Sequence, residues 1–336
     1  MSASPSVSPA ASAALVARLR AAGCVFAEDE ARLLLSAAPD PAALDAMVDR
    51  RVAGVPLEYV LGWAEFCGLR IAVDTAVFVP RRRTEFLVRE AAELLRAADD
   101  GPCTPGAPAV RTPVVLDMCC GSGAIGVALA ATVGDIDLYA ADVDPAAVRC
   151  ARRNVEAVGG RVFSGDLFAP LPATLRGRVD ILAANAPYVP TDAIGMMPPE
   201  ARLHERLVAL DGGPDGLDVV RRVAAQAREW LAPGGHLLVE ANERQAPPAA
   251  ESFARNGLTP RVVHSEEFGA TLVVGTVVGT VVGSVIGSVV GTRRAGPGDR
   301  PAGAPARRRI TREADFRHGR VVSAGRAVRD GNARRG

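Results

Sequence analysis

The stretch VVLDMCCGSGAIGVALAATV, residues 114–133, combines an apolar strand, a turn and a helix. Asp117 lies near the end of the strand, and Gly121 and Gly123 open the helix. A strand that is apolar almost throughout is typical of a parallel sheet whose two faces are both covered by helices. Glycines at the strand end let a ligand approach the backbone, and the helix N-terminus offers unpaired N–H groups. The stretch therefore predicts an α/β sheet with a binding loop at this position.

The same rhythm of strand and helix continues to residue 276. The expected strands cover residues 114–118, 136–142, 161–166, 179–185, 235–241, 259–265 and 270–276, and the expected helices cover 123–133, 145–158, 216–233 and 243–257. Strands that alternate with helices predict a doubly wound, mostly parallel sheet. Ligands bind such sheets beyond the carboxyl ends of the strands, so we expect the functional residues in the loops that follow them.

A smaller helical domain is expected before the sheet. Amphipathic periodicity predicts helices over residues 12–23, 28–38 and 41–54, a hairpin over 65–80, and a helix over 84–98 with Thr84 as its N-cap. The whole chain is then expected to divide into a disordered start (1–10), a helical N-terminal domain (11–64), a hairpin, helix and linker (65–112), the α/β domain (113–276), a repeat (277–292) and a basic disordered tail (293–336).

Composition narrows the setting in which the protein works. The net charge of +1 over 336 residues gives no global attraction to nucleic acid or membrane. The six cysteines lack zinc-type spacing, and a chain of this size does not depend on disulfides, so we expect reduced thiols in the cytoplasm. The N-terminus lacks the basic and apolar regions of a secretory signal. No metal site is expected, because the histidines show no ligand spacing: they are His204, His236, His264 and His318.

Acids follow the second and third expected strands. Asp142 ends the second strand some twenty residues after the glycines, where a carboxylate can accept hydrogen bonds from both hydroxyls of a ribose. The alternative role, a helix N-cap, suits Asp144 better because Pro145 follows it. Asp166 can accept a hydrogen bond from an adenine amino group while Leu167 packs on the ring, although an aspartate in a turn has the same pattern.

The Gly-x-Gly turn by itself leaves two other interpretations open. A tight strand-to-helix turn needs no ligand, and a nicotinamide dinucleotide also binds beside such a turn. The full G-x-G-x-x-G spacing is absent, however, because Cys119 stands where the first glycine would be.

The fourth loop is Asn185-Ala186-Pro187-Tyr188, at the end of the apolar strand VDILAAN. Asn and Pro are ordinary turn formers, so the loop alone decides nothing. The order Gly-x-Gly, acid, acid, Asn-x-Pro-Tyr resembles S-adenosylmethionine-dependent methyltransferases with the seven-stranded fold that methylate a planar amino nitrogen. In that group the loop is usually Asn/Asp-Pro-Pro-Tyr, and here Ala186 replaces the first proline.

Longer motifs make the resemblance more specific. The segment around Pro80, Arg81, Thr84 and Glu85 resembles the linker signature of the release-factor glutamine methyltransferase family. Downstream similarity includes Glu205, Gly212, Gly216, Gly234 and Gly235, and the resemblance runs from about residue 12 to about residue 275. The chain is identified as a divergent member of that family. The resemblance implies the seven-stranded methyltransferase fold, with a helical N-terminal domain that recognises the substrate and a β-hairpin linker.

The resemblance also implies a cofactor, S-adenosylmethionine, and a set of site residues. The residues expected to bind it are Asp117, Cys119, Cys120, Gly121, Ser122, Gly123, Asp142, Asp166, Leu167 and Asn185. In the catalytic loop, the side-chain oxygen of Asn185 and the carbonyl of Ala186 would each accept one N–H of a glutamine amide. Pro187 would stiffen the loop, and Tyr188 would pack on the flat amide. The favoured partner is the Gly-Gly-Gln loop of a translation release factor, with a ribosomal protein second.

Two other functions stay open from the sequence. A methyltransferase acting on adenine or cytosine would carry a basic, aromatic recognition region in its folded part, and the sequence shows none there. A noncatalytic module would keep cofactor binding and hold a partner through the N-terminal domain. The run Arg81 to Arg83 fits an acidic partner or ribosomal RNA, and also fits a solvated surface.

The C-terminus departs from the rest. The units VVGT, VVGT, VVGS, VIGS and VVGT follow one another from Val273 to Thr292; the first belongs to the last strand, and the rest look like its expansion. Glycine at every fourth position weakens helix and strand alike, so an extended or disordered segment is expected. The alternative is a membrane helix with small-residue packing. The Arg-rich tail from residue 293 is expected to be disordered, with at most weak affinity for nucleic acid.

Overall fold

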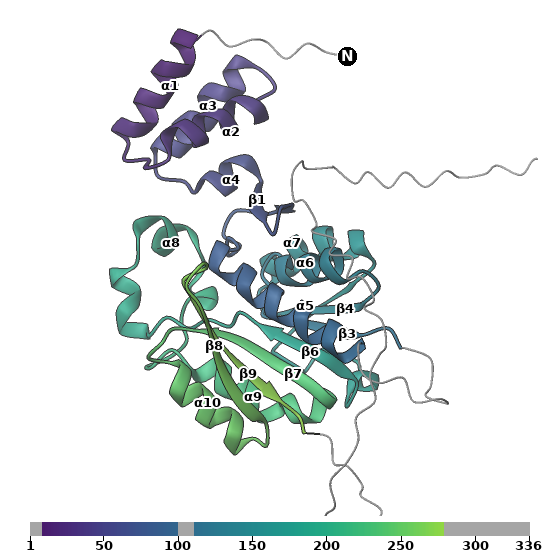
Figure 1. Ribbon diagram of the computed structural model, residues 1–336. Helices are drawn as coiled ribbons and strands as arrows, with labels where there is room; N and C mark the ends of the chain where they lie inside the picture. Colours follow the sequence, from purple (N-terminus) through teal and green to yellow (C-terminus); the bar gives the residue numbers. More distant parts are fainter. Residues whose placement is uncertain (1–8, 100–110, 279–336) are drawn as a thin grey trace, which may run out of the picture. The chain divides into compact units, whose positions relative to one another are not determined.

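The computed structural model describes residues 9–99 and 111–278 of the chain (Figure 1). The expected VVG[ST] repeat from residue 279 and the basic tail lie outside these residues, as do most of the expected linker and disordered start. No helix in the part of the chain that the structure describes is long and apolar enough to cross a membrane.

A seven-stranded sheet forms the centre, in the order β5-β4-β3-β6-β7-β9-β8. Strands β3 to β7 run parallel, and β9 pairs antiparallel with both β7 and β8. The strands are β3 (Val114–Met118), β4 (Asp137–Asp142), β5 (Arg161–Ser164), β6 (Val179–Ala184), β7 (Leu231–Ala241), β8 (Thr259–Ser265) and β9 (Ala270–Thr276). The strand order reverses between β3 and β6, and such switch points are where doubly wound sheets bind ligands.

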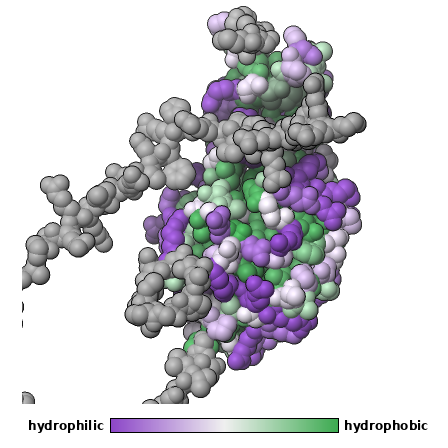
Figure 2. All heavy atoms as spheres, turned by 90° about the vertical axis from the view of Figure 1, so that its right-hand side faces the viewer, coloured by the Kyte–Doolittle hydropathy of each residue, from purple (hydrophilic) through white to green (hydrophobic). Residues whose placement is uncertain are grey.

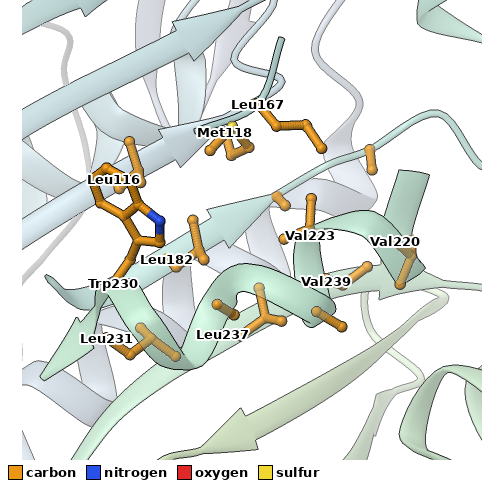
Figure 3. Packing of buried hydrophobic residues seen from close by; sticks show 14 of the residues in the cluster. Leu116, Met118, Leu167, Leu182, Val220, Val223, Trp230, Leu231, Leu237 and Val239 are labelled. Carbon is orange, nitrogen blue, oxygen red and sulfur yellow. The ribbon is translucent and has the colours of Figure 1, made fainter. Parts of the chain in front are cut away.

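Helices cover both faces of the sheet, as the apolar strands predicted (Figure 1). On one face lie α5 (Glu85–Asp99), α6 (Ala124–Val133) and α7 (Pro145–Val155), and on the other lie α9 (Asp218–Trp230) and α10 (Ala246–Arg255). Successive residues of β3 point to opposite faces of the sheet, so Val115 packs in the core beneath α5, α6 and α7, and Leu116 packs in the second core, beneath α9 and α10. Figure 3 shows the second core, where Trp230 and Val223 of α9 meet the sheet residues.

The N-terminal helices form a core of their own. They are α1 (Pro9–Ala21), α2 (Ala27–Ala37), α3 (Pro41–Val52) and α4 (Leu57–Leu61), followed by a hairpin of β1 (Trp63–Phe66) and β2 (Leu69–Ala72). Leu19 and Leu34 are fully buried in this core. Asp40 caps α3 by accepting a hydrogen bond from Ala43 N at 2.8 Å, with Pro41 in the first turn. The three longer helices match the prediction, whereas α4 was not predicted.

Three local predictions were wrong. Helix α9 ends at Trp230 rather than 233, because Leu231 already pairs with Val179 as part of β7. The paired strands of the hairpin cover 63–72, not 65–80. Thr84 does not cap α5: it ends a 3₁₀ turn (Arg82–Thr84), and its hydroxyl donates to the Glu240 carboxylate at 2.7 Å.

The remaining short elements connect the strands. They are the 3₁₀ turns η2 (Glu156–Val158), η3 (Ala173–Leu175), η4 (Thr191–Met196) and η5 (Leu207–Ala209), and the helix α8 (Pro199–His204). On the face seen in Figure 2, apolar residues lie beside hydrophilic ones, as on most folded proteins.

Candidate active site

A cleft of about 600 Å³ opens at the carboxyl ends of the parallel strands. Its walls come from the loops after β3, β4, β5 and β6, and from the linker between the hairpin and α5, which contributes Phe78 and Arg81. Clefts of about 300–1,000 Å³ hold small molecules of cofactor size. The position is the one that the strand order predicted.

The turn after β3 forms the floor of one side of the cleft. Cys119, Gly121 and Gly123 have φ values of +55°, +56° and +77°, so the chain turns through three left-handed residues before α6 begins. A side chain on Gly123 would meet Val155 of α7 at 2.5 Å. The glycine therefore lets α6 pack against α7, while Gly121, Ser122 and the two cysteines line the cleft. Burial raises the pKa of the Cys120 thiol, which favours its neutral form.

Asp117 lies beneath this turn rather than on the cleft wall. The side chain is fully buried, and its Oδ2 accepts a hydrogen bond from Gly126 N at 2.9 Å. Burial, with a smaller contribution from the Asp142 charge, raises its pKa to about 8. Its Oδ1 has no partner among the described residues. Asp117 thus supports the turn and is not among the residues that line the cleft, and its predicted contact with a cofactor stays a prediction.

Asp142 ends β4 and lines the cleft. Its Oδ2 accepts from Gly121 N and its Oδ1 from Asp144 N, both at 2.8 Å. Each carboxylate oxygen keeps a second lone pair for a ligand hydroxyl. Burial raises its pKa, and the backbone donors oppose that rise. Asp144 caps α7 through Ala146 N at 2.9 Å, which confirms its predicted N-cap role, whereas ribose binding by Asp142 stays a prediction.

Asp166 and Leu167 line the cleft after β5. Leu167 is buried with φ +47°, so its backbone holds a left-handed turn. Asp166 is exposed, and its Oδ2 lies 2.5 Å from Arg222 Nη2 of α9. This ion pair, which was not predicted from the sequence, holds the carboxylate at the cleft edge.

The loop Asn185 to Tyr188 faces the glycine turn across the switch point, because Ala184 of β6 pairs with Met118 of β3. Asn185 Oδ1 is buried and has no hydrogen-bond partner among the described residues. A buried acceptor without a partner destabilises the folded state by about 1–3 kcal/mol, and such groups are rare outside functional sites. A ligand that donates an N–H here would remove it.

Three residues that are distant in sequence hold the Tyr188 end of this loop. Gln245 Nε2 donates to Tyr188 O at 2.8 Å and to Asp215 O at 3.1 Å. A side chain on Gly216 would overlap the Tyr188 carbonyl oxygen, and one on Gly212 would come within 2.7 Å of Pro187 O. The backbone of the loop is thus packed so closely that only glycine fits opposite it. Sequence reasoning had found the glycines but missed Gln245, whose local sequence carries no signal for this contact.

Two residues of the arginine run have partners within the chain. Arg83 Nε lies 2.7 Å from Glu240 Oε1, and its guanidinium stands 5.4 Å from the Tyr188 ring centre. Arg81 pairs with Glu205, whose carboxylate also accepts from Val79 N. Neither arginine is simply solvated, as the sequence allowed. Both help to position the cleft walls, since Arg81, Arg83 and Tyr188 line it.

In the part of the chain that the structure describes, no group of three or more His, Cys, Asp or Glu residues could hold a metal ion. Two of the histidines instead make side-chain contacts with threonines: His236 with Thr276 and His264 with Thr271, both at 2.9 Å.

The strand order, with its antiparallel β9 inserted between β7 and β8, and a cleft above the β3 turn define the fold of the S-adenosylmethionine-dependent methyltransferases. Comparison with known proteins agrees, since the methyltransferase small domain model matches residues 107–197. A release factor glutamine methyltransferase from Geobacter sulfurreducens is 40% identical over 236 residues, which are 70% of this chain and 77% of the relative. The chain belongs to the release factor glutamine methyltransferase family.

Two further relatives widen the comparison. A 4-amino-L-phenylalanine/4-methylamino-L-phenylalanine methyltransferase from Streptomyces pristinaespiralis is 34% identical over 221 residues, covering 66% of this chain and 73% of that protein. The crystal structure of a release factor-specific protein-(glutamine-N5) methyltransferase from Alicyclobacillus acidocaldarius shares 24% identity, with a TM-score of 0.35, over 60% of this chain and 94% of the other.

Proposed function

We propose that this protein methylates the side-chain amide nitrogen of a glutamine in a translation release factor, using S-adenosylmethionine. The observation that carries the proposal is Asn185 Oδ1, which is buried at the switch point of a methyltransferase sheet and has no hydrogen-bond partner among the residues that the structure describes. Membership of the release factor glutamine methyltransferase family supports the choice of acceptor.

The residues of the cleft suit the cofactor. The left-handed turn at Gly121 lets a ligand lie close to the backbone, and the free lone pairs of Asp142 suit ribose hydroxyls. Leu167 offers an apolar contact for a purine, and Asp166 lies beside it as an acceptor. When bound, S-adenosylmethionine supplies a methyl group on a positively charged sulfur.

The catalytic work of the chain is to orient the acceptor. An amide nitrogen is a poor nucleophile because its lone pair is delocalised into the carbonyl. Asn185 Oδ1 accepts one N–H and the Ala186 carbonyl accepts the other, which directs the remaining electron pair towards the methyl group. Correct positioning can account for about 7–11 kcal/mol of barrier lowering, so no nucleophilic side chain or metal is required.

Tyr188 covers the flat face of the amide. Its backbone is fixed by Gln245, and its ring is held by the Arg83 guanidinium, which is itself paired with Glu240. Aromatic rings pack well on planar amides, and an immobile ring loses little entropy on binding. The loop thus offers two acceptors and one apolar wall, a set that matches a carboxamide and not a hydroxyl group.

A labelled-methyl assay over a panel of acceptors tests the proposal. The panel holds a release factor, ribosomes, DNA and 4-amino-L-phenylalanine, the last because a relative is named for it. We expect label on the release factor only, at the glutamine of its Gly-Gly-Gln loop. In Asn185→Ala, label should fall at least about a hundredfold while calorimetry shows cofactor affinity within about threefold of wild type. Label that appears only in DNA or only in the arylamine would overturn the choice of substrate.

A further inference from the structure

Residues 189–212, which we call the strap, leave the site directly after Tyr188 and return to it at Gly212. The two ends are joined, since Val189 N donates to Leu210 O at 3.0 Å and Gly212 N donates to Val189 O at 2.9 Å. Thr191 Oγ1 also donates to Asp211 Oδ1 at 2.7 Å. The base of the strap therefore has a fixed position relative to the catalytic loop.

Three charged residues fasten the body of the strap to three separate elements. The pairs are Glu200 with Arg51 of α3 at 2.5 Å, Glu205 with Arg81 of the linker, and Arg206 with Asp144 at the start of α7 at 2.7 Å. One partner in each pair is at least nine-tenths buried. Partly buried pairs are held more firmly than exposed ones, because solvent screens them less. The strap thus has a preset shape, and each of these three charges has an ion-pair partner within the chain, although Arg51 also pairs with Glu30.

The strap exposes four large apolar side chains, beside exposed charged ones such as Asp192 and Arg202. Met196, Leu203, Leu207 and Val208 are 80%, 69%, 60% and 46% exposed. They are four of the eleven exposed large apolar residues in the described part of the chain, and they fall within thirteen consecutive positions. Single exposed apolar residues need no explanation, whereas several on one short segment are typical of a surface that binds another molecule.

The cluster continues into the active-site cleft, because Leu207 and Val208 also line its wall. A glutamine side chain is short, so a protein that inserts one into the cleft must bring its own backbone and neighbouring residues to the rim. The strap is part of that rim. A preset apolar rim would also reduce the entropy lost when the substrate docks.

We propose that the strap is a docking surface for the apolar residues that flank the target glutamine on the protein substrate. This inference rests on the proposed function. The strap has two arginines: Arg206 is paired with Asp144, and Arg202 donates to Gly195 O. Nucleic acid is held by clusters of free cationic side chains, so an apolar protein surface suits the strap better. The strap should therefore govern the affinity for a folded protein substrate and not the methyl transfer itself.

The test compares two double variants of the full-length protein. Met196→Ser/Leu203→Ser removes two apolar side chains that do not line the cleft. Val158→Ser/Val262→Ser removes two exposed valines, 45% and 38% exposed, that are not cleft residues either. Thermal unfolding and calorimetry with the cofactor check that each variant is folded. Each is then assayed on an intact release factor and on a short synthetic peptide that carries only the Gly-Gly-Gln loop.

For the strap variant, we expect the KM for the intact release factor to rise about tenfold, with kcat and the KM for the peptide unchanged. The valine variant should match wild type on both substrates. An unchanged KM for the intact protein would overturn docking, and so would an equal loss on protein and peptide. Sedimentation of a dimer that the strap variant dissociates would assign the surface to a second copy, again against the proposal. If wild type labels neither substrate, the proposed function itself fails, which is a separate result.

Discussion

Replacing Gln245 by leucine should disturb the active site from outside it. The side chain is buried and does not line the cleft, yet its amide nitrogen holds the carbonyls of Tyr188 and Asp215. Leucine is similar in size but cannot donate, so both carbonyls lose this donor. Its Oε1 contact with Asn242 N is long at 3.4 Å and adds little.

The magnitude follows from those two contacts. A buried acceptor that loses its donor costs about 1–3 kcal/mol, and burial of the leucine side chain offsets part of the sum. We expect Gln245→Leu to lower the free energy of unfolding by about 2–4 kcal/mol. Release of the Tyr188 backbone should also lower kcat by about ten- to a hundredfold, since small displacements of reacting groups have effects of that size.

Urea unfolding and single-turnover methyl transfer measure the two effects, and calorimetry measures cofactor affinity, which should stay within about threefold of wild type. Gln226→Leu is the matched control, because Gln226 is exposed on α9 and makes one long contact with Arg222 O at 3.4 Å. The reasoning is refuted if Gln245→Leu is within about 0.5 kcal/mol of the control in stability, or if its kcat is unchanged.

Three other predictions test the roles given to the cleft and to the end of the chain. Asp142→Ala should weaken cofactor binding about ten- to a hundredfold by calorimetry, because Gly121 N and Asp144 N lose their acceptor along with any ribose hydroxyl; unchanged affinity would remove Asp142 from the site. Burial raises the pKa of Asp117 to about 8. The contribution of its protonated form to folding stability is therefore fully present below the unfolded-state pKa and is lost as the pH rises through about 8. The unfolding free energy of the wild type should fall between pH 5 and pH 8, and that of Asp117→Asn should change less. Equal slopes for the two proteins would contradict that assignment. A chain ending at Val278 should keep the wild-type kcat, because Val277 still forms its backbone hydrogen bonds with Gly234 and Gly235. Loss of methyl transfer in this shortened chain would show that the removed residues have a role in activity.

Local patterns predicted most of the sheet and its helices. The apolar run ending at Asp117 became β3, and the pair Asp144-Pro145 began α7, because both signals depend on residues next to one another. Elements whose conformation depends on distant contacts were missed. Helix α4 has only five residues, ends at Leu61 and is followed by Gly62 in a left-handed conformation.

The site was predicted less completely than the fold, for the same reason. The sequence placed the loops at the carboxyl ends of the strands correctly, since that follows from parallel topology. It could not show that Asp117 lies under the turn, that Arg222 pairs with Asp166, or that Gln245 holds Tyr188. Each of these contacts joins residues from different elements, and no local spacing encodes them.

The same contacts account for the rigidity of the loop at Ala186, where the Asn-Pro-Pro-Tyr pattern would place a proline. A proline would restrict the backbone at this position through its ring. Here Ala186 is 1% exposed and packs into the core, so its neighbours already restrict it. Pro187 follows directly, and a residue before proline is itself confined to extended conformations. Gln245, Gly212 and Gly216 then fix the Pro187 and Tyr188 carbonyls. The surrounding fold thus supplies the rigidity that a proline ring would have supplied. The acceptor that we propose at position 186 is a main-chain carbonyl, which either residue provides.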